Sequence, residues 1–420
     1  TKPYTYHEGL FDELLHSRQA YEEALLKKAN LSSEIGRQLV LSADAYVVDR
    51  ESTQGKSIIA GYPFFEDWGR DTMIALAGTT LVTGRLEECK SILQTFAKYE
   101  HHGLLPNLFP EGDVEPMYNS VDAPLLFINA VYEYIQTSKD NAFLPEVWDV
   151  LKRIMTAYEK GTDYHIGMDS DCLIQAGADL EQLTWMDVRV GNYLPTPRHG
   201  KPVEINAYWY NDLEIMKQFA LLQQDNELAQ HYAELADKVK EAFLLKFWNE
   251  EENCLKDVLS GNSEENQVRC NQVWVLSMPY TMLPKEKELC VLHKIKEELY
   301  TTAGLRTLSP RDNAFHDIYI GSMQERDRAY HQGTVWAFPL GAYYRAWIKY
   351  LRQDASDNTS AYKAELAEGI EAIRYWLEEG CLGQLAEIYD GANPTVSRGC
   401  FAQAWSVGEL LRAVYEWEQL

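Results

Sequence analysis

Residues 209–243 read WYNDLEIMKQFALLQQDNELAQHYAELADKVKEAF. Apolar side chains recur along this stretch at steps of three and four residues, first at Trp209, Leu213, Met216 and Ala220, then at Leu228, Tyr232, Leu235, Val239 and Phe243. That spacing places each set on one face of an α-helix. The polar break Gln224-Asp225-Asn226 between the two sets is typical of a turn. The stretch therefore predicts a hairpin of two helices.

The same helical period covers most of the chain. It extends over about 8–29, 70–98, 120–137, 142–160, 285–299, 329–350 and 401–418, and returns at Tyr362, Leu366, Ile370, Ile373 and Leu377. Short breaks such as Thr83-Gly84-Arg85 join consecutive helices. The stretch 164–177 around Asp169-Ser170-Asp171 predicts a small β-hairpin. We therefore expect an all-α fold of about a dozen helices with minor β-hairpins.

The amino-acid composition limits which kinds of molecule the protein can bind. The chain is 46% hydrophobic, as in soluble globular proteins, and no apolar run approaches the ~20 residues that span a bilayer. A formal net charge of −25 argues against nucleic-acid and anionic-membrane partners but not against a neutral sugar. The seven cysteines are scattered without a C-x-x-C pair, which predicts reduced thiols and a cytoplasmic location. Because no metal-ligand spacing is present, we expect no metal and no cofactor.

Helical hairpins in series fit two architectures, an open solenoid or a closed ring of paired helices. Long loops rich in acids, Trp, Gly and Pro separate the helix pairs, at 61–71, 101–122, 165–204, 306–332 and 382–403. Such loops in a compact domain are usually functional. A ring would bring all five to one end, and their similar polar chemistry favours the ring. We expect residues 1–420, which begin at Thr1 without an initiator methionine, to form one catalytic domain that could be the C-terminal part of a longer protein.

Acids and tryptophans in the first two loops are candidates for contact with a sugar. In GYPFFEDWGRDT (61–72), Asp67, Arg70 and Asp71 could hold hydroxyls beside Trp68. A simpler explanation is that Asp71 caps the following helix while Arg70 pairs with a neighbouring acid. Asp122, just before a helix in the second loop, has the same two explanations.

The third and fifth loops carry candidates for acid–base chemistry. Asp187 ends the segment TWMD (184–187), and an apolar wall there would raise the pKa of its carboxyl and keep it protonated, as a general acid requires. Asp187 could equally be a solvated loop acid. In the fifth loop, Glu387 or Asp390 could supply a second carboxylate. We expect His331, in the fourth loop, to be a hydrogen-bonded structural residue.

Seven short motifs become specific when taken together. In order they are FEDWGRDT (65–72), NSVDA (119–123), TWMD (184–187), PTPR (195–198), VEI (203–205), HQGTVW (331–336) and QAWS (403–406). This ordered set resembles the amylo-α-1,6-glucosidase type of glycogen debranching enzyme, glycoside hydrolase family 133. The resemblance extends from about 60 to 410, nearly the whole chain.

The resemblance implies an (α/α)6 barrel with an inverting glucosidase site in the loops at one end. It implies Asp187 as general acid and Glu387 as general base, with Asp390 as the alternative base. The residues expected around the sugar are Asp67, Trp68, Arg70, Asp71, Asp122, Trp185, Glu204, Gln332, Trp336 and Trp405. The implied substrate is a branched α-glucan such as glycogen or a limit dextrin, cleaved without a cofactor because two carboxyls move the protons.

Two other functions fit the same residues. The chain could be another (α/α)6-barrel α-glucosidase, acting on trehalose or on an α-1,4-linked substrate, because similar loops can surround a different pocket. It could also be a non-catalytic helical scaffold that binds glycans. Turnover of a limit dextrin separates these functions.

Overall fold

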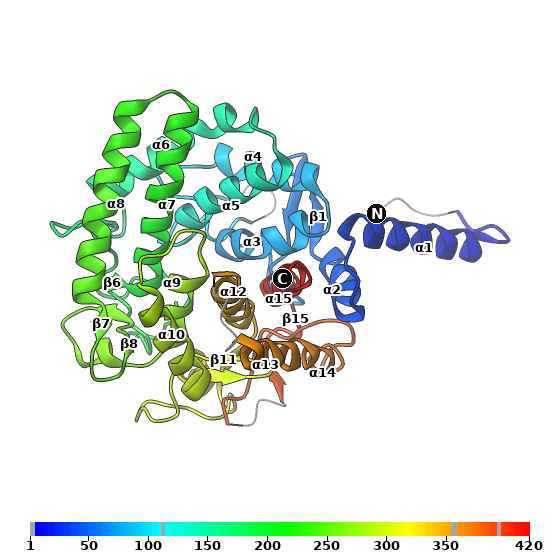
Figure 1. Ribbon diagram of the computed structural model, residues 1–420. Helices are drawn as coiled ribbons and strands as arrows, with labels where there is room; N and C mark the ends of the chain where they lie inside the picture. Colours follow the sequence, from blue (N-terminus) through cyan, green and yellow to red (C-terminus); the bar gives the residue numbers. More distant parts are fainter. Residues whose placement is uncertain (1–4, 111–113, 354–358, 393–395) are drawn as a thin grey trace.

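The computed structural model describes residues 5–110, 114–353, 359–392 and 396–420. Six inner helices form a closed ring in which each contacts the next and the last contacts the first (Figure 1). In order they are α3 (Gly69–Leu76), α5 (Ala123–Ser138), α7 (Val203–Leu222), α9 (Trp274–Ser277), α12 (Phe338–Gln353) and α15 (Ala404–Glu418). The outer helices packed against this ring are α2 (Glu34–Asp44), α4 (Leu86–Lys98), α6 (Phe143–Lys160), α8 (Asn226–Lys246), α10 (Lys285–Lys294) and α13 (Thr359–Glu371). The expected all-α barrel of paired helices is therefore confirmed.

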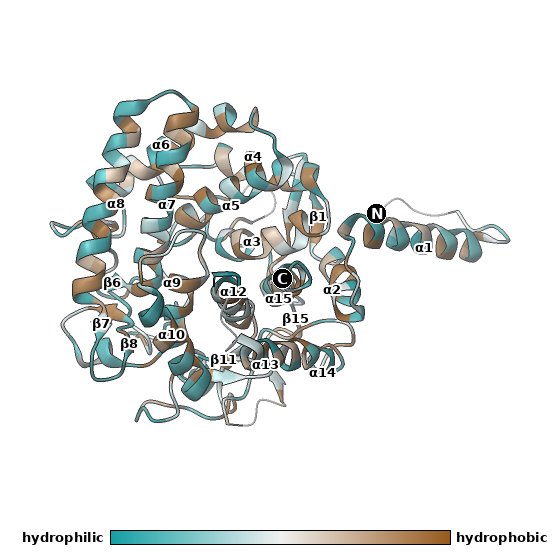
Figure 2. Cartoon of the chain, in the orientation of Figure 1, coloured by the Kyte–Doolittle hydropathy of each residue, from teal (hydrophilic) through white to brown (hydrophobic). Residues whose placement is uncertain are grey.

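The hairpin predicted at 209–243 is α7 followed by α8. Helix α7 is buried on almost every side, as an inner helix must be, whereas α8 buries only the face that carries Tyr232, Val239 and Phe243. Figure 2 accordingly shows hydrophilic and hydrophobic residues side by side along α8. The Asp225 side chain caps α8 by accepting a hydrogen bond from the Leu228 amide at 3.0 Å. The break between the two apolar sets is thus a capped turn.

The ring closes through glycines. Gly78, in the π-helical turn η1 (Ala77–Leu81) that continues α3, faces Gly408 on α15. A Cβ atom on Gly78 would lie 1.9 Å from the Gly408 carbonyl oxygen, which is far inside van der Waals contact. Gly341 on α12 approaches the Glu409 backbone of α15 in the same way, with its Cβ position 2.5 Å away. The last helix therefore touches its two neighbours backbone to backbone.

The five long loops are joined at one end of the ring. Strand β3 (Gly61–Tyr62) in the first loop pairs with β15 (Ala402–Gln403) at the end of the fifth. The Val121 amide donates to the Leu183 carbonyl, which joins the second loop to the third. A five-stranded antiparallel sheet joins the fourth to the fifth, in the order β10 (Tyr300–Thr301), β11 (Gly304–Arg306), β12 (Val335–Trp336), β13 (Ile388–Tyr389) and β14 (Ser397–Arg398). The predicted clustering of the loops is confirmed.

The remaining elements are short, apart from α1 (Leu10–Ala29), which projects from the barrel (Figure 1). They are β1 (Val47–Arg50), β2 (Gly55–Ile58), β4 (Gly167–Met168), β5 (Ile174–Gln175), β6 (Lys201–Pro202), β7 (Trp248–Asn249), β8 (Cys254–Leu255), β9 (Val258–Leu259), η2 (Ser263–Asn266), η3 (Cys270–Val273), η4 (Ile295–Leu299), α11 (Met323–Ala329) and α14 (Ile373–Trp376). Strands β4 and β5 form the hairpin predicted within 164–177. Within the described ranges, no helix combines the length and apolarity needed to cross a bilayer.

One sequence expectation about helix boundaries differs from the structure. The helix expected over 329–350 begins only at Phe338, because Gly333 adopts a positive φ of 137° and 335–336 pair into the sheet as β12. In the helical stretch 70–98, the predicted break Thr83-Gly84-Arg85 is confirmed, because it lies between η1, which continues α3, and α4. Strands of two or three residues are too short for an alternating pattern, so the five-stranded sheet was not expected.

Candidate active site

A buried arginine joins the first three loops. Arg70 lies in the first turn of α3 and is only 3% exposed. Its Nε donates to Asp122 Oδ2 at 2.6 Å, one terminal nitrogen donates to Asp187 Oδ2 at 3.1 Å, and the other donates to the Leu183 carbonyl at 3.1 Å. Burial alone would lower the Arg70 pKa, but the negative charges of Asp122 and Asp187 outweigh it and raise the pKa. The guanidinium therefore stays charged and positions both carboxylates.

The helix-cap explanation of the first two acids is wrong. Trp68 holds the N-cap position of α3, and no side chain caps this helix. Asp122 occupies the N-cap position of α5 without a capping hydrogen bond from its side chain. The Asp122 carboxylate instead accepts from Arg70 and from the Ser120 hydroxyl, the latter at 2.6 Å. The other part of that explanation, in which Arg70 pairs with an acid, is confirmed, and Arg70 pairs with both Asp122 and Asp187.

Three carboxyls from the first, third and fifth loops form one cluster. Burial raises the pKa of Asp71 to about 8, Arg70 opposes this shift, and the charges of Asp187 and Glu387 add to it. Burial also raises the pKa of Asp187 to about 6 against the charge of Arg70. Hydrogen bonds place the three acids in one region: Arg70, next to Asp71 in the chain, donates to Asp187, and Gln403, which donates to Asp71, lies three residues after Cys400, whose amide donates to Glu387. Asp187 keeps a side-chain exposure of 25%, so it is neither a freely solvated loop acid nor a fully buried one.

Glu387 is fixed through both of its oxygens. The Tyr330 hydroxyl donates to Oε1, and the Cys400 amide donates to Oε2 at 2.8 Å. Burial raises the pKa of Glu387 to about 7, while these two hydrogen bonds pull it down. A carboxyl with such a pKa exchanges its proton near neutrality, as acid–base catalysis requires.

Asp390, the alternative base, is engaged elsewhere. Its carboxylate accepts from the Arg398 guanidinium, with the closest approach at 2.8 Å, and from the Tyr319 amide at 2.9 Å. These contacts occupy the oxygens that a water molecule would need. The charge of Glu387, the other acid in the fifth loop, contributes to the raised pKa of Asp71.

Aromatic rings from the third loop, β12, α12 and α15 form a wall. The Trp185 ring packs edge-on against Trp336 and Phe338, with centroids 5.1 and 4.9 Å away, and its indole N–H donates to Asn271 at 2.7 Å. Trp405 stacks on Phe338 at 4.3 Å, and its Nε1 finds no partner among the described residues. Trp185, Trp336 and Trp405 are all buried, whereas Trp68 is partly exposed. Stacking of these four rings on glucose stays a prediction.

Three residues expected to hold sugar hydroxyls also have protein partners. Asp67 accepts from Arg50 at 2.6 Å and also from Ser57 and Thr72. Glu204 forms a two-pronged ion pair with Arg198, and Gln332 donates to Pro195 and accepts from Arg269. Contact of these three residues with sugar hydroxyls stays a prediction.

Three features of the site were not anticipated. Neither nitrogen of the buried His331 ring has a hydrogen-bond partner within the described residues, contrary to expectation, and the ring stacks on Trp336 at 5.0 Å. Burial and nearby arginines hold the His331 pKa well below its ordinary value. Tyr330 was missed although it directly precedes the motif HQGTVW. Gln403, whose Nε2 lies 3.4 Å from Asp71 Oδ1, was quoted only within the motif QAWS.

Comparison with known proteins agrees with this arrangement. The family model described as amylo-alpha-1,6-glucosidase matches residues 41–412, which include the first five ring helices, the first part of α15 and every residue of the cluster. The chain belongs to the amylo-alpha-1,6-glucosidase family. It is therefore a member of a glycoside hydrolase family of the glucosidase and debranching type.

Two yeast proteins resemble this member of the amylo-alpha-1,6-glucosidase family. The glycogen debranching enzyme of Saccharomyces cerevisiae is 25% identical over 86% of this chain, and the match covers 30% of that protein. The mannosyl-oligosaccharide glucosidase of the same organism is 26% identical over 39% of this chain and 21% of its own length. The chain thus spans less than a third of either relative.

The carboxyl cluster should lower stability as pH rises. An acid with a raised pKa keeps its proton in the folded protein at pH values where the unfolded chain has lost it, so stability falls between the unfolded and folded pKa values. For Asp71 that window runs from 3.8 to about 8. We expect Asp71→Asn to raise the melting temperature by roughly 2–5 °C at about pH 8.5 and to change it little at about pH 4.

Thermal unfolding followed by circular dichroism at both pH values measures this effect. Asp237→Asn, at an exposed position of α8, is the matched control and should leave the melting temperature unchanged at either pH. An Asp71→Asn protein that is equally or less stable than the wild type at the higher pH would contradict the prediction.

Proposed function

We propose that this protein releases glucose from α-1,6 branch points of glycogen or a limit dextrin, with inversion at the anomeric carbon. The carboxyl cluster carries the proposal, because it combines Asp187 and Glu387 in a member of the amylo-alpha-1,6-glucosidase family. The likeness to a glycogen debranching enzyme supports the branched substrate. We also propose a cytoplasmic location, which the seven free cysteines support.

In the proposed mechanism Asp187 protonates the departing glycosidic oxygen while Glu387 removes a proton from the attacking water. A pKa of about 6 lets Asp187 hold its proton in mildly acidic solution. The fixed donors on Glu387 orient its carboxylate and favour its charged form. Glu387 has the higher pKa, about 7, so the assignment of roles rests on the family motif and not on the order of the pKa values.

The main alternative to debranching is hydrolysis of a different glucose-containing oligosaccharide. The partial likeness to a mannosyl-oligosaccharide glucosidase favours an α-glucosidase that acts on a different oligosaccharide. A non-catalytic glycan-binding scaffold is the third candidate, and the gathering of three acids with raised pKa values favours catalysis over it.

A substrate panel tests the proposed function. We expect glucose release from glycogen phosphorylase limit dextrin, and none from trehalose or maltose, when each is incubated with the protein and assayed by glucose oxidation. Release from trehalose or maltose instead would assign the chain to the second function. No release from any sugar would leave only the scaffold.

Substitution of the two carboxyls tests their roles. We expect Asp187→Asn and Glu387→Gln each to lower glucose release from limit dextrin by ~10²–10⁴-fold. With α-glucosyl fluoride, whose leaving group needs no proton, Asp187→Asn should recover most of its activity whereas Glu387→Gln should not.

Asp390→Asn is the matched control for this pair, because Asp390 lies in the same loop but is paired with Arg398. We expect this variant to keep its activity on the fluoride to within about tenfold of the wild type. Recovery of Glu387→Gln in place of Asp187→Asn would exchange the two roles, and a larger loss in Asp390→Asn would make Asp390 the base.

The anomer of the product tests inversion. Water must fit between Glu387 and the anomeric carbon, so the two carboxyls should stand roughly 6.5–9.5 Å apart in the sugar complex, against about 5–5.5 Å in a retaining enzyme. We expect β-glucose to be the first product from the α-linkage. Proton NMR within the first minutes reads the anomer before mutarotation, and α-glucose at that time would rule out the inverting mechanism.

A further inference from the structure

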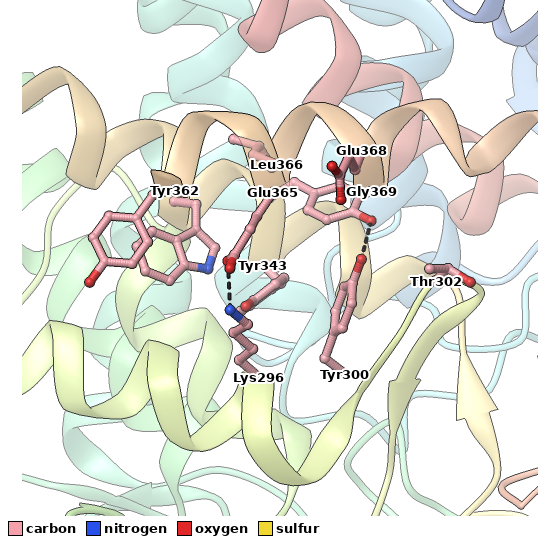
Figure 3. A pocket seen from close by; sticks show the side chains of 11 residues that line it. Lys296, Tyr300, Thr302, Tyr343, Tyr362, Glu365, Leu366, Glu368 and Gly369 are labelled. Carbon is pink, nitrogen blue, oxygen red and sulfur yellow. Dashed lines mark hydrogen bonds and ion pairs between the residues drawn. The ribbon is translucent and has the colours of Figure 1, made fainter. Parts of the chain in front are cut away.

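A cavity separate from the carboxyl cluster lies in the outer wall of the barrel. It has a volume of about 300 Å³ and is enclosed by η4, the start of β10, α12 and α13 (Figure 3). That volume falls within the range of pockets that bind small ligands. None of the residues discussed as the active site lines it.

Aromatic rings form the walls of this cavity. Trp347 and Tyr362 lie with ring centroids 4.7 Å apart and planes tilted by 30°, and Tyr300 and Tyr343 lie 5.5 Å apart at 39°. Tyr343 and Trp347 are buried, whereas Tyr300 and Tyr362 are partly exposed and offer ring surface to the cavity (Figure 3). Flat apolar surfaces with polar edges suit the C–H faces of a pyranose ring.

Polar groups complete the lining. The Tyr300 and Tyr344 hydroxyls face each other at 3.3 Å, and Glu365 pairs with Lys296 at 2.6 Å across the cavity (Figure 3). Gly369 leaves room for the two hydroxyls, because a Cβ atom there would lie 2.6 Å from the Tyr344 oxygen. Glu368, on the exposed surface of α13, adds a second carboxylate. Hydroxyls and carboxylates are the partners that sugar hydroxyls need.

Charge limits the class of ligand. The two carboxylates outnumber the one lysine, which disfavours phosphate and other anions. An aromatic cage of this kind could also take a quaternary ammonium ion. The Glu365 carboxylate, which such a cation would need as a partner, is already paired with Lys296. A neutral polyol satisfies both conditions.

We propose that this cavity binds a glucosyl unit of the α-glucan at a distance from the point of cleavage, and this inference rests on the proposed function. Strand β10, at the cavity, and β13, which follows Glu387, are separated by β11 and β12 in one sheet. Neighbouring strands lie ≈ 4.8 Å apart, so the two strands are about 14 Å from each other. A polymer of a few glucosyl units can reach from one site to the other, and a second point of attachment strengthens binding to the polymer.

Affinity electrophoresis in gels that contain glycogen tests the cavity directly. Asp187→Asn serves as the parent protein so that the polymer is not consumed. We expect Tyr362→Ala in this parent to weaken glycogen binding by about tenfold. Tyr375→Ala, which removes a 71% exposed tyrosine outside the cavity, should bind like the parent. Equal binding by Tyr362→Ala and its parent would overturn the proposal.

Glu368→Gln is a second variant that leaves the aromatic packing intact. In the otherwise wild-type protein we expect Tyr362→Ala and Glu368→Gln to raise the half-saturating concentration of limit dextrin and to leave hydrolysis of α-glucosyl fluoride unchanged. If the wild type released no glucose from limit dextrin, the proposed function would fail while the gel comparison still reported on the cavity. Calorimetry with tetramethylammonium provides the last test. If the protein bound this ion, and Tyr362→Ala abolished that binding while glycogen binding stayed unchanged, the proposal would be overturned.

Discussion

The ion pairs of Arg70 are the interaction on which the candidate site depends. A guanidinium that is only 3% exposed must have its charge balanced by protein groups, and here Asp122, Asp187 and the Leu183 carbonyl do so. These partners come from two loops that follow different helices. Because both loops are bonded to the same Arg70 guanidinium, this side chain determines where the loops lie relative to α3. The fixed geometry of Arg suits this better than a flexible lysine would.

Arg70 also limits the repulsion among carboxyls that the cluster brings together. Asp71, Asp187 and Glu387 all have pKa values raised by burial, and the charges of the last two raise that of Asp71 further. A protein selected only for stability would not gather three acids in this way. Natural proteins tend to accept such destabilisation where chemistry requires protons to move near neutral pH. The glycine contacts of α15 and the surrounding aromatic wall supply rigid packing beneath this region.

The sequence predicted the architecture better than the partners of individual side chains. Helical periodicity reports which face of a segment is buried, so α7, α8 and their turn were identified from spacing alone. Ring closure was inferred from loops that are distant in sequence yet similar in chemistry. Periodicity carries no information about which acid a given arginine meets. The pairing of Arg198 with Glu204 was therefore not predicted, and neither was the contact of Tyr330 with Glu387, because a tyrosine beside a motif has no distinctive spacing.

Closure of the ring has a consequence for how the chain acquires its site. Gln403 Nε2 and Asp71 Oδ1, which lie 3.4 Å apart, belong to residues separated by 332 positions in the sequence, and the partners in the β3–β15 pair are separated by even more. Contacts between such remote segments form late in folding, because the entropy of closing a long loop is lost before these contacts stabilise the structure. During synthesis on a ribosome, α3 emerges long before α15. The carboxyl cluster therefore stays incomplete until almost the whole domain has been made, and premature termination removes the site as well as the last helix.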